Sequence, residues 1–285
     1  MLDVILDTLK DNAKLTVFLY VTYLLMEFIE HKTSEKAEQS IRKAGTVGPL
    51  AGGLLGIVPQ CGFSASASGF YAGRVISLGT LIAVFLSTSD EMLPVCISEQ
   101  ADIKLIGKIL AAKAVTGIVL GFAVDGVMRV LNKGKKPEAI HCLCENDDCH
   151  CEEESIFRSA LHHTVKIAVF IFIITFILNT VIYFTGEEKL AKLFVDIPVV
   201  SCAVSGIVGL IPNCAASVVI TELYLKGLIN TGAMLSGLLT GSGIGLLVLF
   251  RTNRNIKENI GITVLLYILG VAVGSVVQLT GISLI

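Results

Sequence analysis

A proline followed two residues later by a cysteine occurs twice in the chain, each time in the middle of a long apolar, glycine-rich stretch. Pro59-Gln60-Cys61 recurs 153 residues later as Pro212-Asn213-Cys214. Proline has no backbone N–H and its ring clashes with the preceding turn, so a helix ends where each motif begins. Each stretch is therefore expected to hold either one broken helix or two half-helices.

Other residues repeat at the same spacing, which indicates that the chain consists of two related halves. Identical pairs 153 residues apart include Gly56 and Gly209, Ser64 and Ser217, Tyr71 and Tyr224, Gly79 and Gly232, Gly117 and Gly270, and Gly121 and Gly274. An internal repeat of this kind predicts two copies of one architecture, with the proline breaks at corresponding points.

Composition places both halves in a membrane. Hydrophobic residues make up 53% of the chain, charged residues only 16%, and the mean hydropathy is +0.78, whereas soluble proteins carry about 25% charged residues. The net charge is -2 and the sequence has no arginine-rich patch, so a nucleic-acid partner is not expected. Six segments are long enough to cross a hydrocarbon core of ~30 Å, near residues 14–30, 75–97, 107–130, 164–184, 228–250 and 260–283.

The distribution of basic residues suggests how the two interrupted segments, 46–73 and 197–225, are arranged. Cytoplasmic loops collect lysine and arginine, and 14 of the 22 basic residues fall inside if each segment enters and leaves on the same side. We therefore expect an all-α integral membrane protein with two inverted repeats. Each repeat has about three full spans plus a Pro-x-Cys-broken re-entrant helix pair, which gives eight to ten hydrophobic segments in the chain.

A hydrophilic linker, residues 131–160, joins the first transmembrane repeat, 1–130, to the second, 161–285. It carries a dense set of soft and borderline metal ligands: His141, Cys142, Cys144, Cys149, His150 and Cys151. Such ligands favour Zn, Cu(I) or trivalent arsenic, and in a reducing cytoplasm the cysteines are not expected to form structural disulfides. The linker thus either binds a metal ion or is a tether with incidental cysteines; no other cofactor is required.

The broken segments are the first candidates for a transport site, because transporters with inverted repeats bind substrate where discontinuous helices meet near the midplane. The matching positions supply amides, thiols and hydroxyls: Pro59, Gln60, Cys61, Gly62 and Ser64 in the first half, and Pro212, Asn213, Cys214 and Ser217 in the second. The alternative is that the prolines only kink the helices and the cysteines only pack.

Two adjacent acids provide a second candidate. Ser89, Asp90 and Glu91 lie within an apolar segment, where a charge costs a few kcal/mol and is by default functional; the alternative places them in a loop or at the interface. The second half has Gly243 and Ile244 at the positions of the acids, so only the first half is expected to carry a charged cation or coupling site. Two further acids, Glu222 and Asp125, are additional candidates. In the alternative interpretation, Glu222 only ends a half-helix and Asp125 faces the water interface.

The sequences Val58-Pro59-Gln60-Cys61-Gly62-Phe63-Ser64, Ser87-Thr88-Ser89-Asp90-Glu91 and Ile211-Pro212-Asn213-Cys214 resemble those of ten-span heavy-metal exporters. Members of that family are labelled arsenic efflux proteins or manganese transporters, and the arsenical permeases are similar more distantly. The resemblance implies functional positions at Pro59 to Ser64, Ser89 to Glu91 and Pro212 to Ser217. The second copy departs from the first, with Ala215-Ala216 in place of Gly62-Phe63.

These observations favour an inner-membrane permease that exports a heavy-metal or metalloid ion of the arsenite or Mn(II) class by gradient-driven alternating access. The chain has no Walker A sequence and no phosphorylatable aspartate motif, and no enzyme is expected. Cys61 and Cys214 would serve as soft ligands, which favour trivalent arsenic, and Asp90 and Glu91 as hard ligands, which favour Mn(II). The ligands therefore do not decide between the two substrates. Two alternatives are a permease for a small organic or sulfur-containing solute, and a membrane metal sensor that acts through the linker.

Overall fold

The computed structural model describes residues 47–58, 61–89, 92–131, 198–212 and 214–281, with Gly45 and scattered positions between 16 and 24 and between 157 and 176. Helices are the only regular secondary structure in this part of the chain. Four are long and apolar enough to cross a membrane: Leu78–Ser98, Ile103–Leu131, Thr231–Thr252 and Ile256–Thr280. The prediction of an all-α, multi-span protein is confirmed, while the expected spans near 14–30 and 164–184 lie largely outside the described residues.

Within the described residues, the two halves contain the same five helices. The first half has α3 (Gly48–Gly56), α4 (Cys61–Ala72), α5 (Leu78–Ser87), α6 (Met92–Ser98) and α7 (Ile103–Leu131). The second half has α10 (Pro198–Gly209), α11 (Cys214–Leu225), α12 (Thr231–Thr240), α13 (Gly245–Thr252) and α14 (Ile256–Thr280). From α4 and α11 onward, corresponding helices begin 153 residues apart, so the spacing read from the sequence also fixes the helix boundaries.

Matching residues also start the central helix of each half. Ser77 caps α5 by accepting a hydrogen bond from the backbone N–H of Thr80 at 3.1 Å. Asn230, 153 residues later, caps α12 by accepting one from the backbone N–H of Ala233 at 2.8 Å. Serine and asparagine are both favoured N-caps because their side-chain oxygens satisfy amides that have no partner within the helix.

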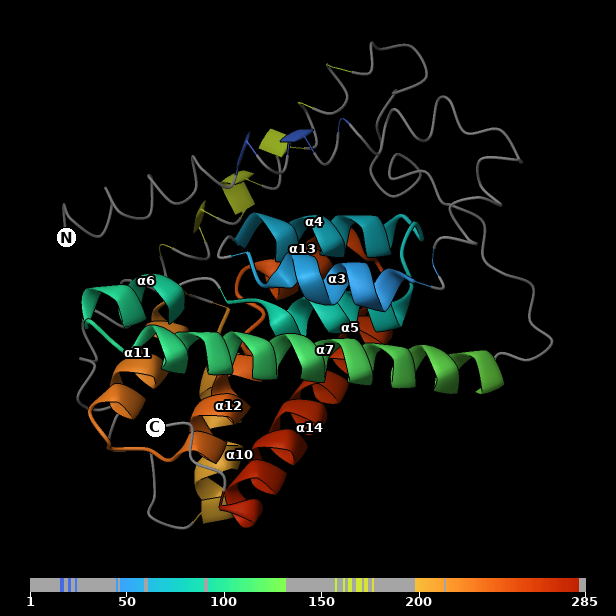
Figure 1. Ribbon diagram of the computed structural model, residues 1–285. Coiled ribbons are helices and arrows are strands. Elements are labelled where there is room, and N and C mark those ends of the chain that lie inside the picture. The colour runs from blue at the N-terminus through green and yellow to red at the C-terminus, as the bar shows by residue number, and fades with distance from the viewer. Residues whose placement is uncertain are drawn as a thin grey trace.

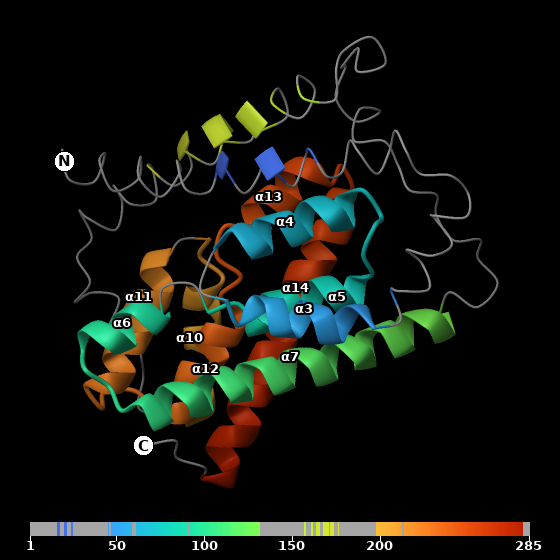
Figure 2. The same ribbon diagram turned by 45° about the horizontal axis from the view of Figure 1, so that its top comes forward.

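Helices α3 and α4 form a hairpin. They lie side by side and run in opposite directions, joined at the end where the first proline motif stands (Figure 1, Figure 2). The chain therefore leaves the hairpin toward the end from which it entered, as the re-entrant arrangement predicts. Helix α5 then starts at that same end of the molecule and runs back beside α7.

Close contacts between glycines hold the central helices α5 and α12 against the long helices α7 and α14. A Cβ atom placed on Gly79 would lie 2.2 Å from the carbonyl oxygen of Gly121, and one on Gly232 would lie 2.5 Å from that of Gly274. No side chain fits at either place. Small residues allow such approaches between membrane helices, which explains why these glycines recur in both halves.

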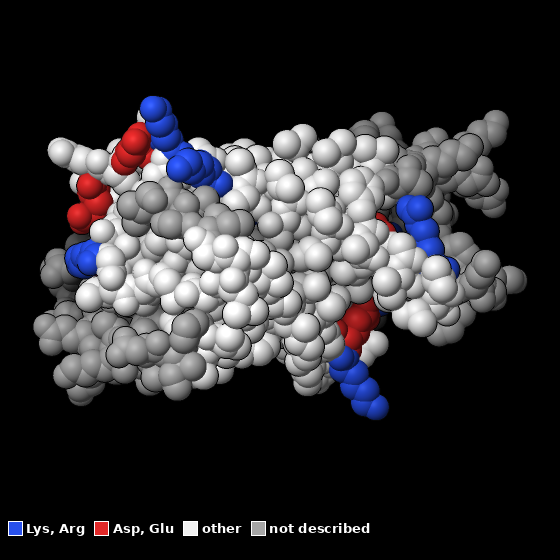
Figure 3. Space-filling model, turned by 60° about the horizontal axis from the view of Figure 1, so that its bottom comes forward, with Lys and Arg blue, Asp and Glu red and all other residues white. Residues whose placement is uncertain are grey.

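The outer surfaces of α7 and α14 are apolar and exposed. Val115 and Val119 on α7, and Ile260, Val264 and Ile268 on α14, recur at helical spacing with about half or more of each side chain exposed. Charged side chains gather toward the two ends of the face seen in Figure 3, and a broad uncharged belt lies between them. A lipid bilayer is the surrounding that such a belt requires.

The halves interlock through their short helices. Helix α4 packs chiefly on α13 of the other half, and α11 packs on α6 in return. Ser68 of α4 donates a hydrogen bond to the carbonyl oxygen of Gly245, at the start of α13, at 2.7 Å. The pairs α4 with α13 and α11 with α6 exchange with each other under the repeat, which is the pattern of two halves related by an approximate two-fold rotation, as in a symmetric dimer.

Candidate functional site

Three helices stop near the centre of the molecule, where their last carbonyl groups lose their helical partners. Helix α5 ends before Thr88, α10 ends at Gly209, and α12 ends before Gly241. Hydroxyl groups satisfy part of this demand: Thr88 Oγ1 donates to the carbonyl oxygen of Val84 at 2.7 Å, and Thr240 Oγ1 donates to that of Gly206 at 3.0 Å. The sequence thus provides polar groups where it breaks the helices.

A small cavity lies where these helix ends meet. Its volume is about 10 Å³, close to the smallest that holds one water molecule. The first half contributes Thr88, Ser89, Met92 and Lys113, and the second half contributes Gly209, Ala216, Ser217, Leu238, Gly241 and Gly243. The cavity therefore belongs to the interface between the repeats.

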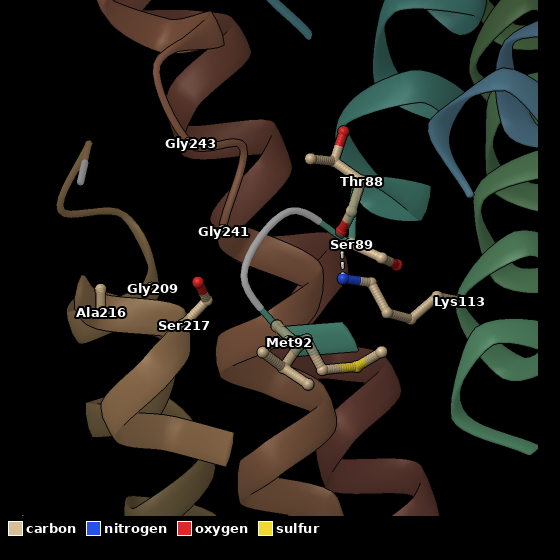
Figure 4. A pocket seen from close by; sticks show the side chains of 10 residues that line it. Thr88, Ser89, Met92, Lys113, Gly209, Ala216, Ser217, Gly241 and Gly243 are labelled. Atoms are coloured by element: carbon tan, nitrogen blue, oxygen red, sulfur yellow. Dashed lines mark hydrogen bonds between the residues drawn. The ribbon is translucent and has the colours of Figure 1, made fainter. Parts of the chain in front are cut away.

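Lys113 is the charged side chain that lines this cavity among the described residues. It stands in the middle of α7, is only 1% exposed, and its ammonium donates a hydrogen bond to the carbonyl oxygen of Thr88. Figure 4 shows it extending from α7 to the end of α5, with Ser217 of α11 across the space. The ammonium meets the C-terminal end of α5, where the helix dipole favours a positive charge.

The sequence analysis missed Lys113, although a signal for it was present. A lysine within the apolar segment 107–130 is as unusual as the acids Asp90 and Glu91, because any charge inside a membrane span is costly. Asp90 and Glu91 themselves lie outside the described residues, but the residues on either side of them, Ser89 and Met92, both line the cavity.

Two of the predicted site residues, Ser89 and Ser217, line the cavity directly. Ser64 is fully buried on α4, where that helix packs closely against Gly245 of α13. Gly62, two residues before it, is also buried. Glu222 lies near the far end of α11 and forms an ion pair with Lys226 at 2.9 Å, outside the cavity lining.

Several predicted positions cannot be placed. Pro59, Gln60, Asn213 and the whole set of linker ligands, His141 to Cys151, lie outside the described residues. Cys61 and Cys214 are the first residues of α4 and α11, but their side chains are not among the parts that the structure describes. Pro212 is half-buried in the bend that follows α10.

No group of three or more His, Cys, Asp or Glu side chains comes together within the part of the chain that the structure describes. The thiols of Cys96 and Cys202, both in that part, are free and fully buried in the core. The predicted metal ligands at the transport site and in the linker therefore stay predictions.

At two positions of the cavity lining, the repeat counterpart carries a larger, aromatic side chain. Phe63 stands in place of Ala216, Phe85 in place of Leu238, and Leu266 in place of Lys113. Phe85 is fully buried, and a Cβ atom placed on Gly245 would lie only 2.8 Å from its ring. Two-fold related halves thus produce one open position near the centre, and its charge comes from the first half.

Asp125 has a structural role at the start of α5. Its carboxylate accepts a hydrogen bond from Ser77 Oγ at 2.7 Å and another from the backbone N–H of Gly79 at 2.8 Å. The side chain is buried and not at a water interface. It anchors the N-terminus of α5 to α7, and a carboxylate is well placed there because the helix dipole favours a negative charge.

The sequence matches a protein family described as "Putative, 10TM heavy-metal exporter" over residues 1–139 and again over residues 127–250. The chain belongs to this family. Membership confirms the resemblance read from the motifs, and the family description is that of an exporter. Its description counts ten membrane segments, of which the described residues hold four that are long enough to span a membrane, together with the shorter apolar helices Val199–Gly209 and Ala216–Leu225. No curated protein and no solved structure shows a significant match to the chain.

Proposed function

We propose that this member of the heavy-metal exporter family moves a metal or metalloid ion through the central cavity by alternating access between its two halves. The observation that carries the proposal is the position of the cavity. It lies at the repeat interface and is lined by the ends of discontinuous helices from both halves, which is where transporters of this construction hold their substrates.

The electrostatics of the helix ends support a positively charged substrate. Helices α5, α10 and α12 end at the cavity with their C-termini, while α6 and α11 begin there with their N-termini. Exposed carbonyl groups carry partial negative charge and favour cations. Ser89 and Ser217 add hydroxyl oxygens to the lining, and oxygen ligands suit hard cations such as Mn(II).

The arsenite or Mn(II) class stays the proposed substrate. Cys61 and Cys214 begin the two helices that follow the proline motifs, and thiols at these positions would favour trivalent arsenic. In this scheme the permease lies in the inner membrane, residues 1–130 and 161–285 form the moving repeats, and the Cys/His linker between them is cytoplasmic. The energy comes from an ion or proton gradient.

Filling the cavity provides the direct test. Ala216→Phe introduces the side chain that Phe63 supplies at the counterpart position, and should reduce export of manganese and arsenite from cells to background because the substrate has no room. Val218→Phe, on the same helix but outside the cavity lining, should retain export at an equal membrane level. Undiminished export by a well-folded Ala216→Phe protein would show that the ion takes another path.

A further inference from the structure

Lys113 is a charge that the fold itself does not require. It is buried in the middle of a membrane-spanning helix, and the second half has Leu266, also fully buried, at the corresponding position. A leucine therefore satisfies the same packing role in the repeat. Burial of an ammonium group inside a membrane costs several kcal/mol on some scales, so packing alone does not account for this residue.

The ammonium of Lys113 and a transported cation would compete for the same space. The ammonium lies against the Thr88 carbonyl, and the cavity beside it measures about 10 Å³. Because a cavity of this size holds about one water molecule, a cation that keeps several waters of its hydration shell does not fit next to the lysine. A lysine side chain can retreat, because its charge sits on a flexible four-carbon stem.

Two acidic residues are adjacent in the sequence to residues that line the cavity with Lys113. Asp90 and Glu91 connect Ser89 to Met92, and both of these described neighbours line the cavity together with Lys113. The second half has neither the acids nor the lysine at the matching positions. Negative charge and internal cation therefore occur together in one half and are absent together from the other.

We propose that Lys113 is a tethered cation that alternates with the transported ion in the site, an inference that rests on the proposed function. When the metal ion leaves, the ammonium occupies the end of α5 and balances the charge of the unloaded site, so the protein can change conformation without its substrate. When the metal ion enters, repulsion and lack of space displace the ammonium.

The test separates two kinds of flux in proteoliposomes that contain the full-length protein. Radioactive Mn(II) is followed first as net flux into metal-free buffer, which requires the unloaded protein to return, and then as exchange with unlabelled Mn(II) on both sides. A parallel set uses arsenite. Lys113→Met removes the charge at similar length and should lower net flux at least tenfold, whereas exchange stays within about twofold of the natural protein.

Binding gives a second readout that a purely structural role would not produce. Removing a nearby like charge should tighten Mn(II) binding by Lys113→Met roughly tenfold or more, the scale of effect that a neighbouring charge within ~4–6 Å exerts. Lys113→Arg, which keeps the charge, should retain measurable net flux. Lys108→Met, at an exposed position on the same helix, should resemble the natural protein in both assays.

Each outcome decides between the possibilities. Loss of exchange together with net flux in a folded Lys113→Met protein, or net flux equal to that of the natural protein, would overturn the tethered-cation role. Should that variant not fold, Lys113→Leu, the residue of the second repeat, replaces it under the same criteria. If the natural protein moves neither Mn(II) nor arsenite in either assay, the proposed function itself fails and the role of Lys113 with it.

Discussion

Arg74 and Glu258 join the two halves of the molecule through a pair of parallel hydrogen bonds, Nη1 to Oε1 at 2.7 Å and Nη2 to Oε2 at 2.9 Å. Arg74 follows α4 and Glu258 lies in the first turn of α14. The hydroxyl of Tyr71 donates to the same carboxylate. At the opposite end of the molecule the matching residues are Gly227 and Leu105, so this connection occurs once.

Arg74→Ala should lower the free energy of unfolding in detergent by about 1–2 kcal/mol, as expected for a partly buried charge-assisted pair. Arg74 has a φ of 59°, a left-handed conformation that costs most residues about 1 kcal/mol and glycine little. Arg74→Gly, which copies Gly227, should therefore lose less stability than the alanine variant. The exposed Lys226 to Glu222 pair is the control, since Lys226→Ala should cost under about 0.5 kcal/mol; equal losses for Arg74→Ala and Lys226→Ala would contradict the assignment.

Gly121→Ala should prevent stable folding or lower the unfolding temperature sharply. A Cβ atom at this position would lie 2.6 Å from the carbonyl oxygen of Gly79 and 2.8 Å from Ala83, so α5 and α7 would have to separate. Gly126→Ala, further along the same helix, meets no atom within 4 Å and should be neutral or slightly stabilising because alanine favours helix by up to about 1 kcal/mol. Thermal unfolding in detergent compares the two, and similar behaviour would refute close packing at Gly121.

Asp125→Asn should destabilise the protein by about 1 kcal/mol, because a neutral amide replaces a carboxylate that accepts two hydrogen bonds. Transport per folded molecule should be retained, since Asp125 is not part of the cavity lining. The second half has Gln278 at the corresponding position, which indicates that an amide fits there. Flux in proteoliposomes, normalised to folded protein, provides the measurement; loss of transport without loss of stability would instead place Asp125 in ion coupling.

Replacing Cys61 and Cys214 together by serine separates the two proposed substrates. If thiols select the substrate, the double variant should lose arsenite resistance and keep manganese resistance, because serine retains an oxygen ligand but no soft one. Growth of a sensitive strain that expresses each variant across both ions gives the result. Cys96→Ser, a change to a free buried thiol in the core, serves as the control. Full arsenite resistance in the double variant would eliminate the soft-ligand interpretation.

The helix breaks at the two Pro-x-Cys motifs followed from the sequence because their cause is local. The breaks between α5 and α6 and between α12 and α13 were not predicted, since 75–97 and 228–250 were each expected to be one span. A proline terminates the preceding helix whatever surrounds it, and the 153-residue spacing carried the boundaries of one half to the other. The repeated glycines were also readable, although only the structure shows that Gly79 meets Gly121 and Gly232 meets Gly274. Which surfaces glycines bring together depends on packing between distant segments.

The composition of the site was less accessible to sequence reasoning. The described cavity joins the second Pro-x-Cys element, near Ser217, to the Ser89 break of the first half, and the expected meeting of the two Pro-x-Cys elements stays a prediction because Pro59, Gln60 and Asn213 lie outside the described residues. Such pairing depends on how the repeats rotate against each other, which no local pattern encodes. Lys113, in contrast, could have been predicted from the sequence, because the cost of burying a charge in a membrane span applies to lysine as it does to aspartate.

Phe85 stands at the position that corresponds to Leu238 of the cavity lining, and this difference suggests why the two halves are fused in one chain. Two separate copies of one repeat would form a symmetric dimer, and any lysine placed at the centre would occur twice, with two like charges in a medium of low dielectric. Fusion allowed the copies to diverge, so that the first half carries Lys113 together with Phe63 and Phe85, while the second half carries the smaller Ala216 and Leu238 that line the cavity. The molecule thereby carries a single ionic centre on a two-fold scaffold.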